Sequence, residues 1–445
     1  MKVWTAMTAA LLLCGVLHAD RTVWYVHPDS ALNTIQSALD TCADNDIVLV
    51  APGTYYENIV WPSKQGIHLI SELGAEATII DGSDTGTVVR LEGNIIDNST
   101  IIRGFKIQHG HGHGYPGYDW WGGGIYCNDL ASPVIVDNII TNNVADSMGG
   151  GILSANGASP VIRDNIITEN SAVWGGGVAQ WFPVSRPKII KNEIYNNTAI
   201  NYGGGIYTNY YSRPLIDSCT VFDNYATYGG SGVFAYYECS LKIANTTVIN
   251  NSQPTAIQLW QNCFADLFNC TVSNPTISQG INCRNNSEVN IWQCSITDHL
   301  IGLNLMIPSN AIINYSNLEN NSLYGVLNQN ANIIINAEDN WWGDATGPYH
   351  PDSNPGGLGS PVSNYVDFTP WMLHWGVEET PIVKTVKNHD FIHPTIFRGP
   401  LVLPKGRKCR VFDITGRKVE PASISPGIYF VEIDGKIENK VIKVR

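Results

Sequence analysis

Gly122-Gly123-Gly124-Ile125-Tyr126 is the first of five glycine-rich blocks that return through the middle of the chain. The third position of the block falls at residues 124, 151, 177, 205 and 232, so successive blocks lie 27, 26, 28 and 27 residues apart. A repeat of this length is typical of a solenoid, in which each repeat is one coil that cannot bury its apolar side chains alone. The five blocks therefore predict a stack of coils.

Short runs between the blocks keep the same period. An aliphatic residue and an asparagine three positions later return every 27 residues, beginning with Ile140 and Asn143. β-branched runs such as 133–136 and 188–190 are too short for helices and are bounded by Asn, Gly and Pro, which predicts strands. A coil of three short strands without a helical pattern predicts an all-β fold, a right-handed single-stranded parallel β-helix with the aliphatic column in its core.

A second asparagine column, Asn138, Asn165 and Asn192, precedes the aliphatic column by two residues. Equal positions of stacked coils lie about 4.8 Å apart, as neighbouring strands do. Asparagine tolerates the left-handed backbone conformation and can hydrogen-bond along the stack. We therefore expect these three residues at one tight turn, each in the left-handed conformation.

The Gly-Gly-Gly-Ile blocks and Asn-Ile-Ile coils resemble the pectin-lyase-like family of right-handed β-helix proteins over roughly residues 30–370. This resemblance implies the fold. The family includes polysaccharide lyases, hydrolases and esterases, but also binding and passenger proteins without catalysis, so the fold does not decide the function. The lyase and esterase motifs of the family are not visible in this chain.

The N-terminal residues 1–19 have the pattern of a secretory signal peptide, with Lys2, an apolar run from Thr8 to Leu17, and Ala19 at the expected cleavage point. This run is too short to cross a bilayer, and we expect no transmembrane segment later in the chain. Residues 20–376 are assigned to the β-helix. A short helix at 34–39 is expected to cap its first coil, and aromatic segments at 340–348 and 366–371 its last.

Residues 377–395 are interpreted as a linker and 396–445 as a separate small β-sandwich-like domain. Its segments 411–419, 426–433 and 440–444 read VFDITGRKV, PGIYFVEI and KVIKV. They resemble the C-terminal sorting domain of the type IX secretion system. This resemblance implies export through the periplasm, recognition by the outer-membrane secretion machinery, and a secreted or outer-surface location.

The charge is unevenly distributed along the chain. Residues 381–445 hold 13 of the 26 Lys and Arg and 6 of the 39 Asp and Glu, so residues 1–380 hold 13 basic and 33 acidic residues, a net charge of −20. An acidic body argues against nucleic acid as a partner. It also disfavours a polyanionic glycan unless a divalent cation bridges the two. We therefore expect a neutral or weakly charged extracellular polysaccharide as the partner.

Aromatic residues stand next to the glycine blocks, and sugar rings bind flat on aromatic faces. Most lie directly before a block and others follow its strand. The candidate substrate-binding residues are Trp121, Trp174, Trp181, Tyr202, Tyr228 and Tyr236. In the alternative interpretation these rings stack on one another and only stabilise the solenoid.

Catalysis on a polysaccharide needs acidic groups, and a glycosidase needs two carboxylates across the scissile bond. Asp137 and Asp164 share a column one coil apart, followed by Lys191, which is an arrangement for calcium and a base in a β-eliminating lyase. In the alternative interpretation this column is solvated and inert. The catalytic candidates are Asp119, Asp129, Asp137, Asp164, Lys191 and Glu238.

Two functional classes therefore stay open. One is a polysaccharide-binding protein that is also a lyase or glycoside hydrolase, with calcium as its one indicated cofactor. The other is a non-catalytic adhesin or structural surface protein. Arg284 and His299 are isolated candidates in the late coils.

The histidines and cysteines offer further hypotheses. Three alternating histidines at 109, 111 and 113 are candidate metal ligands. Cys219, Cys270 and Cys294 fall in one column of the repeat, which predicts a ladder of buried thiols. A Cys270–Cys294 disulfide between adjacent coils is the alternative.

Overall fold

The structure of the protein is a computed structural model. It describes residues 21–112, 122–252, 254–275, 278–375, 394–397, 409–413, 417–421, 427–433 and 436–443. The chain divides into two compact units, Met1–Trp375 and Gly376–Arg445, which are described separately. The predicted signal peptide, residues 1–19, lies outside the described residues. Within the described ranges, no helix is long and apolar enough to cross a membrane.

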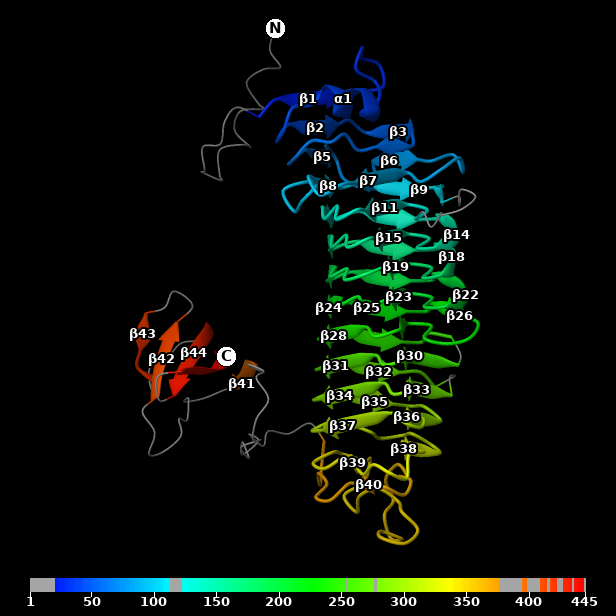
Figure 1. Ribbon diagram of the computed structural model, residues 1–445, viewed down its shortest axis with the longest axis vertical. Helices are drawn as coiled ribbons and strands as arrows, with labels where there is room; N and C mark the ends of the chain where they lie inside the picture. The colour runs from blue at the N-terminus through cyan, green and yellow to red at the C-terminus, as the bar shows by residue number, and fades with distance from the viewer. Residues whose placement is uncertain are drawn as a thin grey trace. The chain divides into compact units, whose positions relative to one another are not determined.

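The first unit is a stack of parallel coils, with strands of successive coils paired in register (Figure 1). We name its sheets A to D. Sheet A has 14 strands: β1 (Val23–Val26), β2 (Ile47–Val50), β5 (His68–Ser71), β8 (Ile101–Arg103), β12 (Val134–Val136), β16 (Val161–Arg163), β20 (Lys188–Ile190), β24 (Leu215–Asp217), β28 (Ser240–Ala244), β31 (Phe264–Phe268), β34 (Glu288–Trp292), β37 (Asn310–Asn314), β39 (Ile335–Asn336) and β40 (Val366–Asp367).

Sheets B and C complete the wall of the solenoid. Sheet B has 10 strands: β3 (Gly53–Tyr56), β6 (Thr78–Asp81), β9 (Lys106–Gln108), β13 (Ile139–Thr141), β17 (Ile166–Thr168), β21 (Glu193–Tyr195), β25 (Thr220–Phe222), β29 (Thr247–Ile249), β32 (Thr271–Ser273) and β35 (Ser295–Thr297). Sheet C has 11 strands: β4 (Ile59–Val60), β7 (Val89–Glu92), β11 (Ile125–Asn128), β15 (Ile152–Ala155), β19 (Val178–Trp181), β23 (Ile206–Asn209), β27 (Val233–Tyr236), β30 (Thr255–Trp260), β33 (Gln279–Arg284), β36 (Ile301–Leu305) and β38 (Tyr324–Asn328).

A fourth strand per coil was not predicted. Sheet D has five strands: β10 (His111–Gly112), β14 (Val144–Met148), β18 (Ser171–Trp174), β22 (Thr198–Tyr202) and β26 (Tyr225–Ala226). They run between the asparagine column that begins with Asn143 and the glycine block, where an extended chain pairs with its equivalents above and below. The prediction of three strands per coil is therefore wrong for these coils. Beyond β26 the repeat shortens and sheet D ends.

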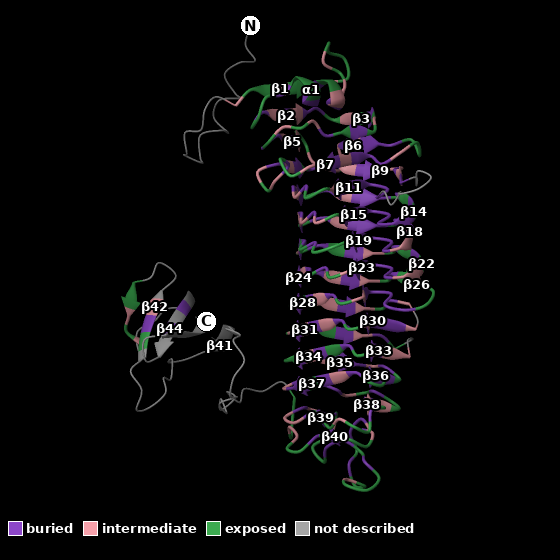
Figure 2. Cartoon of the chain, viewed as in Figure 1, coloured by how far each residue is buried: buried purple, intermediate pink, exposed green. Residues whose placement is uncertain are grey.

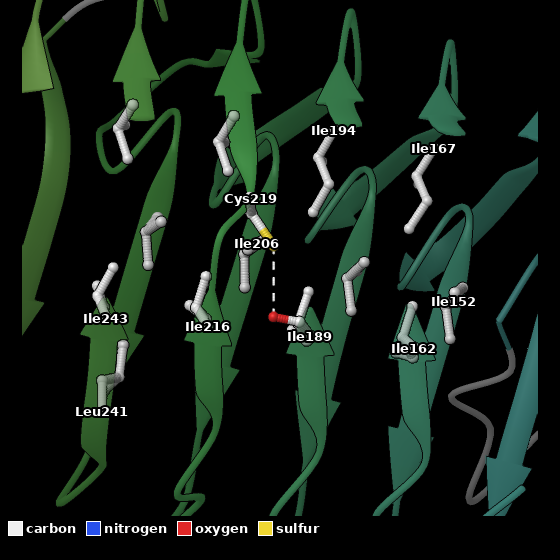
Figure 3. Close-up of a cluster of buried hydrophobic side chains, with 14 of the residues drawn as sticks. Ile152, Ile162, Ile167, Ile189, Ile194, Ile206, Ile216, Cys219, Leu241 and Ile243 are labelled. Atoms are coloured by element: carbon white, nitrogen blue, oxygen red, sulfur yellow. Dashed lines mark hydrogen bonds between the residues drawn. The ribbon is translucent and has the colours of Figure 1, made fainter. Parts of the chain in front are cut away.

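The core is the predicted aliphatic column together with the inward residues of sheets A and C (Figure 3). Side chains on the sheet B column are fully buried in every regular coil, and the strand register places each on its neighbour. Burying such a side chain contributes about 1.5–3 kcal/mol. Figure 2 shows this buried layer along the strands. The predicted parallel β-helix is confirmed.

The glycine blocks are required by close approach between coils. A Cβ atom on Gly176 would lie 2.4 Å from the backbone oxygen of Thr198, which is closer than any side chain tolerates. Gly175 has a φ of +68°, in the left-handed region that favours glycine. Both positions therefore favour glycine where the chain turns sharply from sheet D into sheet C, and only the fifth block has another residue, Ser231, at the position of Gly176.

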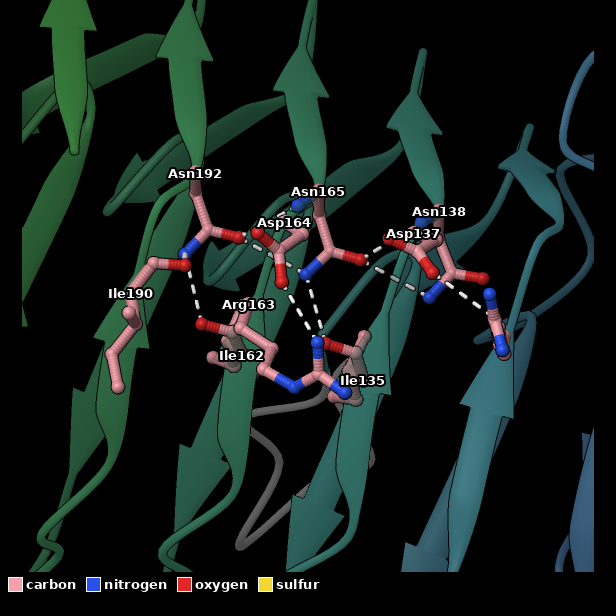
Figure 4. Close-up of polar contacts among 10 residues, drawn as sticks. Ile135, Asp137, Asn138, Ile162, Arg163, Asp164, Asn165, Ile190 and Asn192 are labelled. Atoms are coloured by element: carbon pink, nitrogen blue, oxygen red, sulfur yellow. Dashed lines mark hydrogen bonds and ion pairs between the residues drawn. The ribbon is translucent and has the colours of Figure 1, made fainter. Parts of the chain in front are cut away.

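The asparagine column that begins with Asn138 forms a buried ladder (Figure 4). The side-chain amide of Asn138 donates to Oδ1 of Asn165 at 3.1 Å, and that of Asn165 donates to Oδ1 of Asn192 at 3.0 Å. The predicted bonding along the stack is confirmed. The predicted left-handed conformation is wrong, because φ is positive one residue earlier, at Asp137 and Asp164. That bend turns the following asparagine side chain into the solenoid.

Both ends of the stack are capped as predicted. Helix α1 (Ile35–Thr41) begins after Thr34, whose side chain accepts a hydrogen bond from the amide of Ser37, and it buries Ile35 and Leu39 in the core. Fully buried Trp342 lies at the other end, where β40 is the last strand of sheet A. These groups cover apolar area that open coils would expose to water.

The predicted thiol ladder is also present. The eight cysteines whose side chains the structure describes are free and buried. The backbone amide of Cys270 donates to the sulfur of Cys294 at 3.4 Å, so a thiol takes the place of an asparagine oxygen. The alternative disulfide between these two residues is not formed.

The described strands of the second unit form one sheet in the order β41-β45-β44-β42-β43. Neighbours are antiparallel except β41 and β45, which are parallel. The bounds are β41 (Pro394–Phe397), β42 (Cys409–Asp413), β43 (Lys418–Val419), β44 (Gly427–Ile433) and β45 (Lys436–Lys443). The sandwich-like arrangement stays a prediction.

Candidate functional site

The outer face of sheet C carries an apolar cluster that is separate from the core. Residues of a strand point alternately inward and outward, so the residue after each block's Ile or Val points outward. Five such residues are nevertheless at most 5% exposed: Tyr126, Leu153, Ala179, Tyr207 and Phe234. They pack with buried Met148 and Ala155 and with partly buried rings at Trp174, Trp181, Tyr202, Tyr236 and Trp260. We call this set the outer aromatic cluster.

One row of the cluster comes from sheet D. Met148, Trp174 and Tyr202 end their strands and lie in register with one another. The glycine turn that follows folds their side chains over sheet C, where the Tyr202 ring stacks on Phe234 with a centroid distance of 4.4 Å. The residues that directly precede the glycine blocks therefore lie over sheet C, although they belong to sheet D. Tyr228 is out of register, because Tyr202 pairs with Gly229, and its side chain is 58% exposed.

The other row comes from the last residues of sheet C strands. Trp181 ends β19, Tyr236 ends β27 and Trp260 ends β30. The Tyr236 and Trp260 rings meet edge-on at 5.6 Å, and Trp260 also meets the Tyr202 ring edge-on at 5.8 Å. Each of these rings is partly exposed. The two rows therefore present aromatic surface on either side of the buried outward residues.

Amides continue the outward column beyond Phe234. Gln258, Asn282 and Asn304 follow it in register and are all buried. Oε1 of Gln279 accepts from the side-chain amides of Asn282 at 2.5 Å and Asn304 at 3.1 Å. The outer face thus changes from aromatic to amide between two adjacent coils.

Several of these residues were missed from the sequence: Tyr207, Phe234, Gln258, Trp260, Asn282 and Asn304. For Tyr207 and Phe234 the available signal was the outward position two residues after the third glycine of the block, whereas the other four lie beyond the last block. Arg284, considered an isolated residue, is part of the surface, because its guanidinium lies 4.6 Å from the centre of the Trp260 ring.

Acidic groups are absent from the sheet C strands of this face beyond β7, which ends in Glu92. None of the described sheet C strands from β11 to β38 contains Asp or Glu. Asp129 and Glu238 lie in the turns after β11 and β27, four coils apart, which corresponds to about 19 Å at 4.8 Å per coil. Paired glycosidase carboxylates lie about 5–9.5 Å apart, so these two cannot act as such a pair. Asp119 and Trp121 lie outside the described residues.

The Asp137, Asp164 and Lys191 column lies at the turn between sheets A and B, whereas the aromatic cluster lies over sheet C. Figure 4 shows the two carboxylates at this turn. Each carboxylate has an arginine partner: Asp137 pairs with Arg103 at 3.0 Å and Asp164 with Arg163 at 2.8 Å. Each exposed ion pair engages Oδ2 of its carboxylate, and a calcium ion would compete with the arginine for that oxygen.

Two of the predicted histidine ligands engage different carboxylates. Nδ1 of His109 lies 2.8 Å from Asp81, and Nε2 of His111 lies 2.9 Å from Asp146. Burial raises the pKa of Asp81, but hydrogen bonds, first from Gln108, leave it below its ordinary value. Among the described residues, no three His, Cys, Asp or Glu side chains are grouped to hold a metal. His113 lies outside the described residues.

His299 is a buried structural residue. It is 2% exposed, and its Nε2 lies 3.2 Å from the carbonyl oxygen of Val272. Its backbone amide donates to Oδ1 of Asn321, as asparagines in this column do in earlier coils. Burial lowers the pKa of His299 to about 4, so the ring is neutral near pH 7.

Three solved structures have a similar fold at low sequence identity. The mannuronan C-5 epimerase A-module from Azotobacter vinelandii is 15% identical with a TM-score of 0.42, covering 69% of this chain and 90% of its own. Pectate lyase Pel9A is 12% identical with a TM-score of 0.40, covering 79% and 80%. The catalytic unit of an α-1,3-glucanase from Streptomyces thermodiastaticus is 9% identical with a TM-score of 0.39, covering 82% and 71%. At these values the likeness concerns the fold alone.

Comparison with curated protein sequences finds no match. The family described as the right-handed β-helix region matches residues 53–192 and 174–278. The two matches overlap and together span residues 53–278, which is 226 of 445 residues and just over half of the chain. The chain belongs to the right-handed β-helix family.

Proposed function

We propose that this protein binds extracellular polysaccharide on the outer aromatic cluster. The observation that carries this proposal is the set of partly exposed rings gathered over successive coils on one outer face: Trp174, Trp181, Tyr202, Tyr236 and Trp260. Sugar rings stack on such faces, and the polar rim supplies partners for their hydroxyl groups.

The neighbouring amides support the proposal. Gln279, Asn282 and Asn304 provide donors and acceptors beside the rings. In the alternative, purely structural role, each ring pair would contribute about 0.5–1.5 kcal/mol to the stability of the solenoid. Stacking such as that of Tyr202 on Phe234 contributes this stability while leaving part of the Tyr202 ring available to a ligand.

The absence of Asp and Glu from the described sheet C strands β11 to β38 favours binding over hydrolysis. Activity as a lyase or hydrolase is therefore the second outcome that the experiment must detect. A non-catalytic adhesin would use the same surface for attachment.

The experiment is a panel of neutral and acidic glycans applied to the full chain, with calcium and with a chelator. Binding and the release of reducing or unsaturated ends are both measured. We expect binding without product, lost in Trp174→Ala and Tyr202→Ala. Tyr195→Ala is the matched control, because that ring stacks on Phe222 at 4.7 Å on sheet B. Product formation would make the protein an enzyme, and absence of all binding would refute the proposal.

We also propose a secreted or outer-surface location, on the basis of two segments of the chain. Residues 1–19 would direct export, and the second unit would be recognised by the outer-membrane secretion machinery. Strands β42, β44 and β45 coincide with the three segments that resemble a sorting domain, which supports this part of the proposal. Deleting residues 394–445 should leave the protein in the periplasm, as measured by cell fractionation. Unchanged release or surface display would contradict it.

A further inference from the structure

We propose that the bound glycan carries a sparse anionic substituent, a carboxylate or a sulfate ester, which pairs with Arg284. This inference rests on the proposed function and specifies its ligand. Arg284 lies at the end of β33, in register with Trp260 at the end of β30. It therefore stands at the edge of the outer aromatic cluster, where the aromatic residues give way to amides.

Arg284 is held in place but has no counter-ion within the described part of the chain. Its guanidinium lies 4.6 Å from the Trp260 ring centre, and the side chain is partly buried. None of the ion pairs among the described residues includes it. A partly buried cation without an anion is costly, and an anionic ligand would remove that cost.

Three buried polar atoms without a hydrogen-bond partner lie in the same patch. They are Nε1 of Trp260, Oδ1 of Asn282 and Nε of Arg284. Asn282 and Arg284 are two residues apart on the same face of β33, so their Cα atoms lie about 7 Å apart. Such atoms usually have partners, and the proposed ligand, with its hydroxyl groups and the water that it orders, would supply them.

The surrounding charge limits how many anionic groups the ligand can carry. Residues 1–380 have a net charge of −20, while the sheet C strands around Arg284 contain no acidic residue. A polyanion would be repelled by the body as a whole. One anionic group on an otherwise neutral chain would meet Arg284 over uncharged amides and rings.

The test uses one oligosaccharide in two forms. The probes are a xylan oligosaccharide with a single glucuronate side group and the same compound after reduction of its carboxyl group to an alcohol. A sulfated galactan oligosaccharide forms a third arm that distinguishes sulfate from carboxylate. Kd is measured by calorimetry for the full chain, for Arg284→Gln, and for Arg163→Gln, a control arginine that pairs with Asp164 on another sheet.

We expect an anionic probe to bind about ten- to a hundredfold more tightly than the neutral form, as for a hydrogen bond to a charged group. Arg284→Gln should abolish this preference and retain the weaker neutral binding, while Arg163→Gln should keep it. Equal Kd values for the acidic, sulfated and reduced probes in the unmodified chain would overturn the inference and leave glycan binding intact. Absence of binding to every probe and to the glycan panel would overturn both proposals.

Discussion

Replacing Asn197 by alanine tests whether the buried asparagine ladders stabilise the solenoid. Oδ1 of Asn197 accepts from the backbone amide of Asn170 at 3.1 Å and from its side-chain amide at 3.0 Å. The side-chain amide of Asn197 donates to Oδ1 of Asn224 at 3.0 Å and to the carbonyl oxygen of Ile167 at 2.9 Å. Alanine removes these four bonds and a fifth, from the same side-chain amide to the carbonyl oxygen of Tyr195 at 3.0 Å, all at a fully buried position.

The cost follows from the groups that lose their partners. The backbone amide of Asn170 remains buried without an acceptor, and its side-chain amide keeps only the carbonyl oxygen of Ile140 at 2.9 Å. An unsatisfied buried donor costs about 1–3 kcal/mol, to which the loss of the remaining bonds adds. A total of about 3 kcal/mol corresponds to an increase of about a hundredfold in the equilibrium constant for local opening. Because each coil contacts only its neighbours, we expect the effect in the coils of residues 166–226 and not in residues 300–328.

Hydrogen exchange measured by mass spectrometry gives the local opening free energy in each coil. Thr198→Ala is the control, because Thr198 is the adjacent residue and its side chain is exposed, so its replacement should cost less than about 0.5 kcal/mol. If exchange in residues 166–226 were the same in Asn197→Ala and Thr198→Ala, the ladder would not be a source of stability and this reasoning would be refuted.

Three further predictions concern single positions. Burial lowers the pKa of His299 to about 4. As the pH falls, the unfolded state therefore binds a proton at this residue at a higher pH than the folded state does. The contribution of neutral His299 to the free energy of unfolding is complete above about pH 6.5 and is lost as the pH falls towards 4. His299→Asn should remove this pH dependence of the free energy of unfolding, which amounts to up to about 3 kcal/mol. Urea denaturation at several pH values measures it. Burial raises the pKa of Cys219 to about 11, so a thiol reagent at pH 8 should label it only after unfolding, as peptide mass spectrometry would show. Gly176→Ala would place Cβ against the backbone of Thr198 and should lower the urea midpoint, whereas an unchanged midpoint would contradict the close approach.

The period of the repeat predicts the core of this fold, because equal positions in successive coils must stack. Ile140 and Ile167 were therefore placed correctly without coordinates, and the register confirms them. The backbone conformation was less predictable. Asn138 and Asp137 both belong to the turn, and composition alone does not distinguish which residue makes the bend and which is turned into the interior.

The candidate site was predictable only in part. The column of Trp174 and Tyr202 follows from the glycine blocks, since both lie directly before one. Trp260 is found only through the strand register, because the loop between its coil and that of Phe234 shortens the repeat. The pairing of Arg284 with Trp260 depends on side-chain directions, which the period does not determine.

The distribution of acidic residues gives a physical reason for placing the ligand on sheet C. The body is strongly acidic, and the candidate carboxylates Asp129, Asp137, Asp164 and Glu238 lie in turns with positive φ, where short polar side chains are tolerated. A carboxylate on the outer face of sheet C would be desolvated against the aromatic rings, which is costly without a partner. The sheet C strands from β11 to β38 therefore form a strip along an acidic solenoid whose one charged residue is Arg284. A glycan of low charge would approach this strip with the least electrostatic repulsion, and a single anionic substituent would find its counter-ion there.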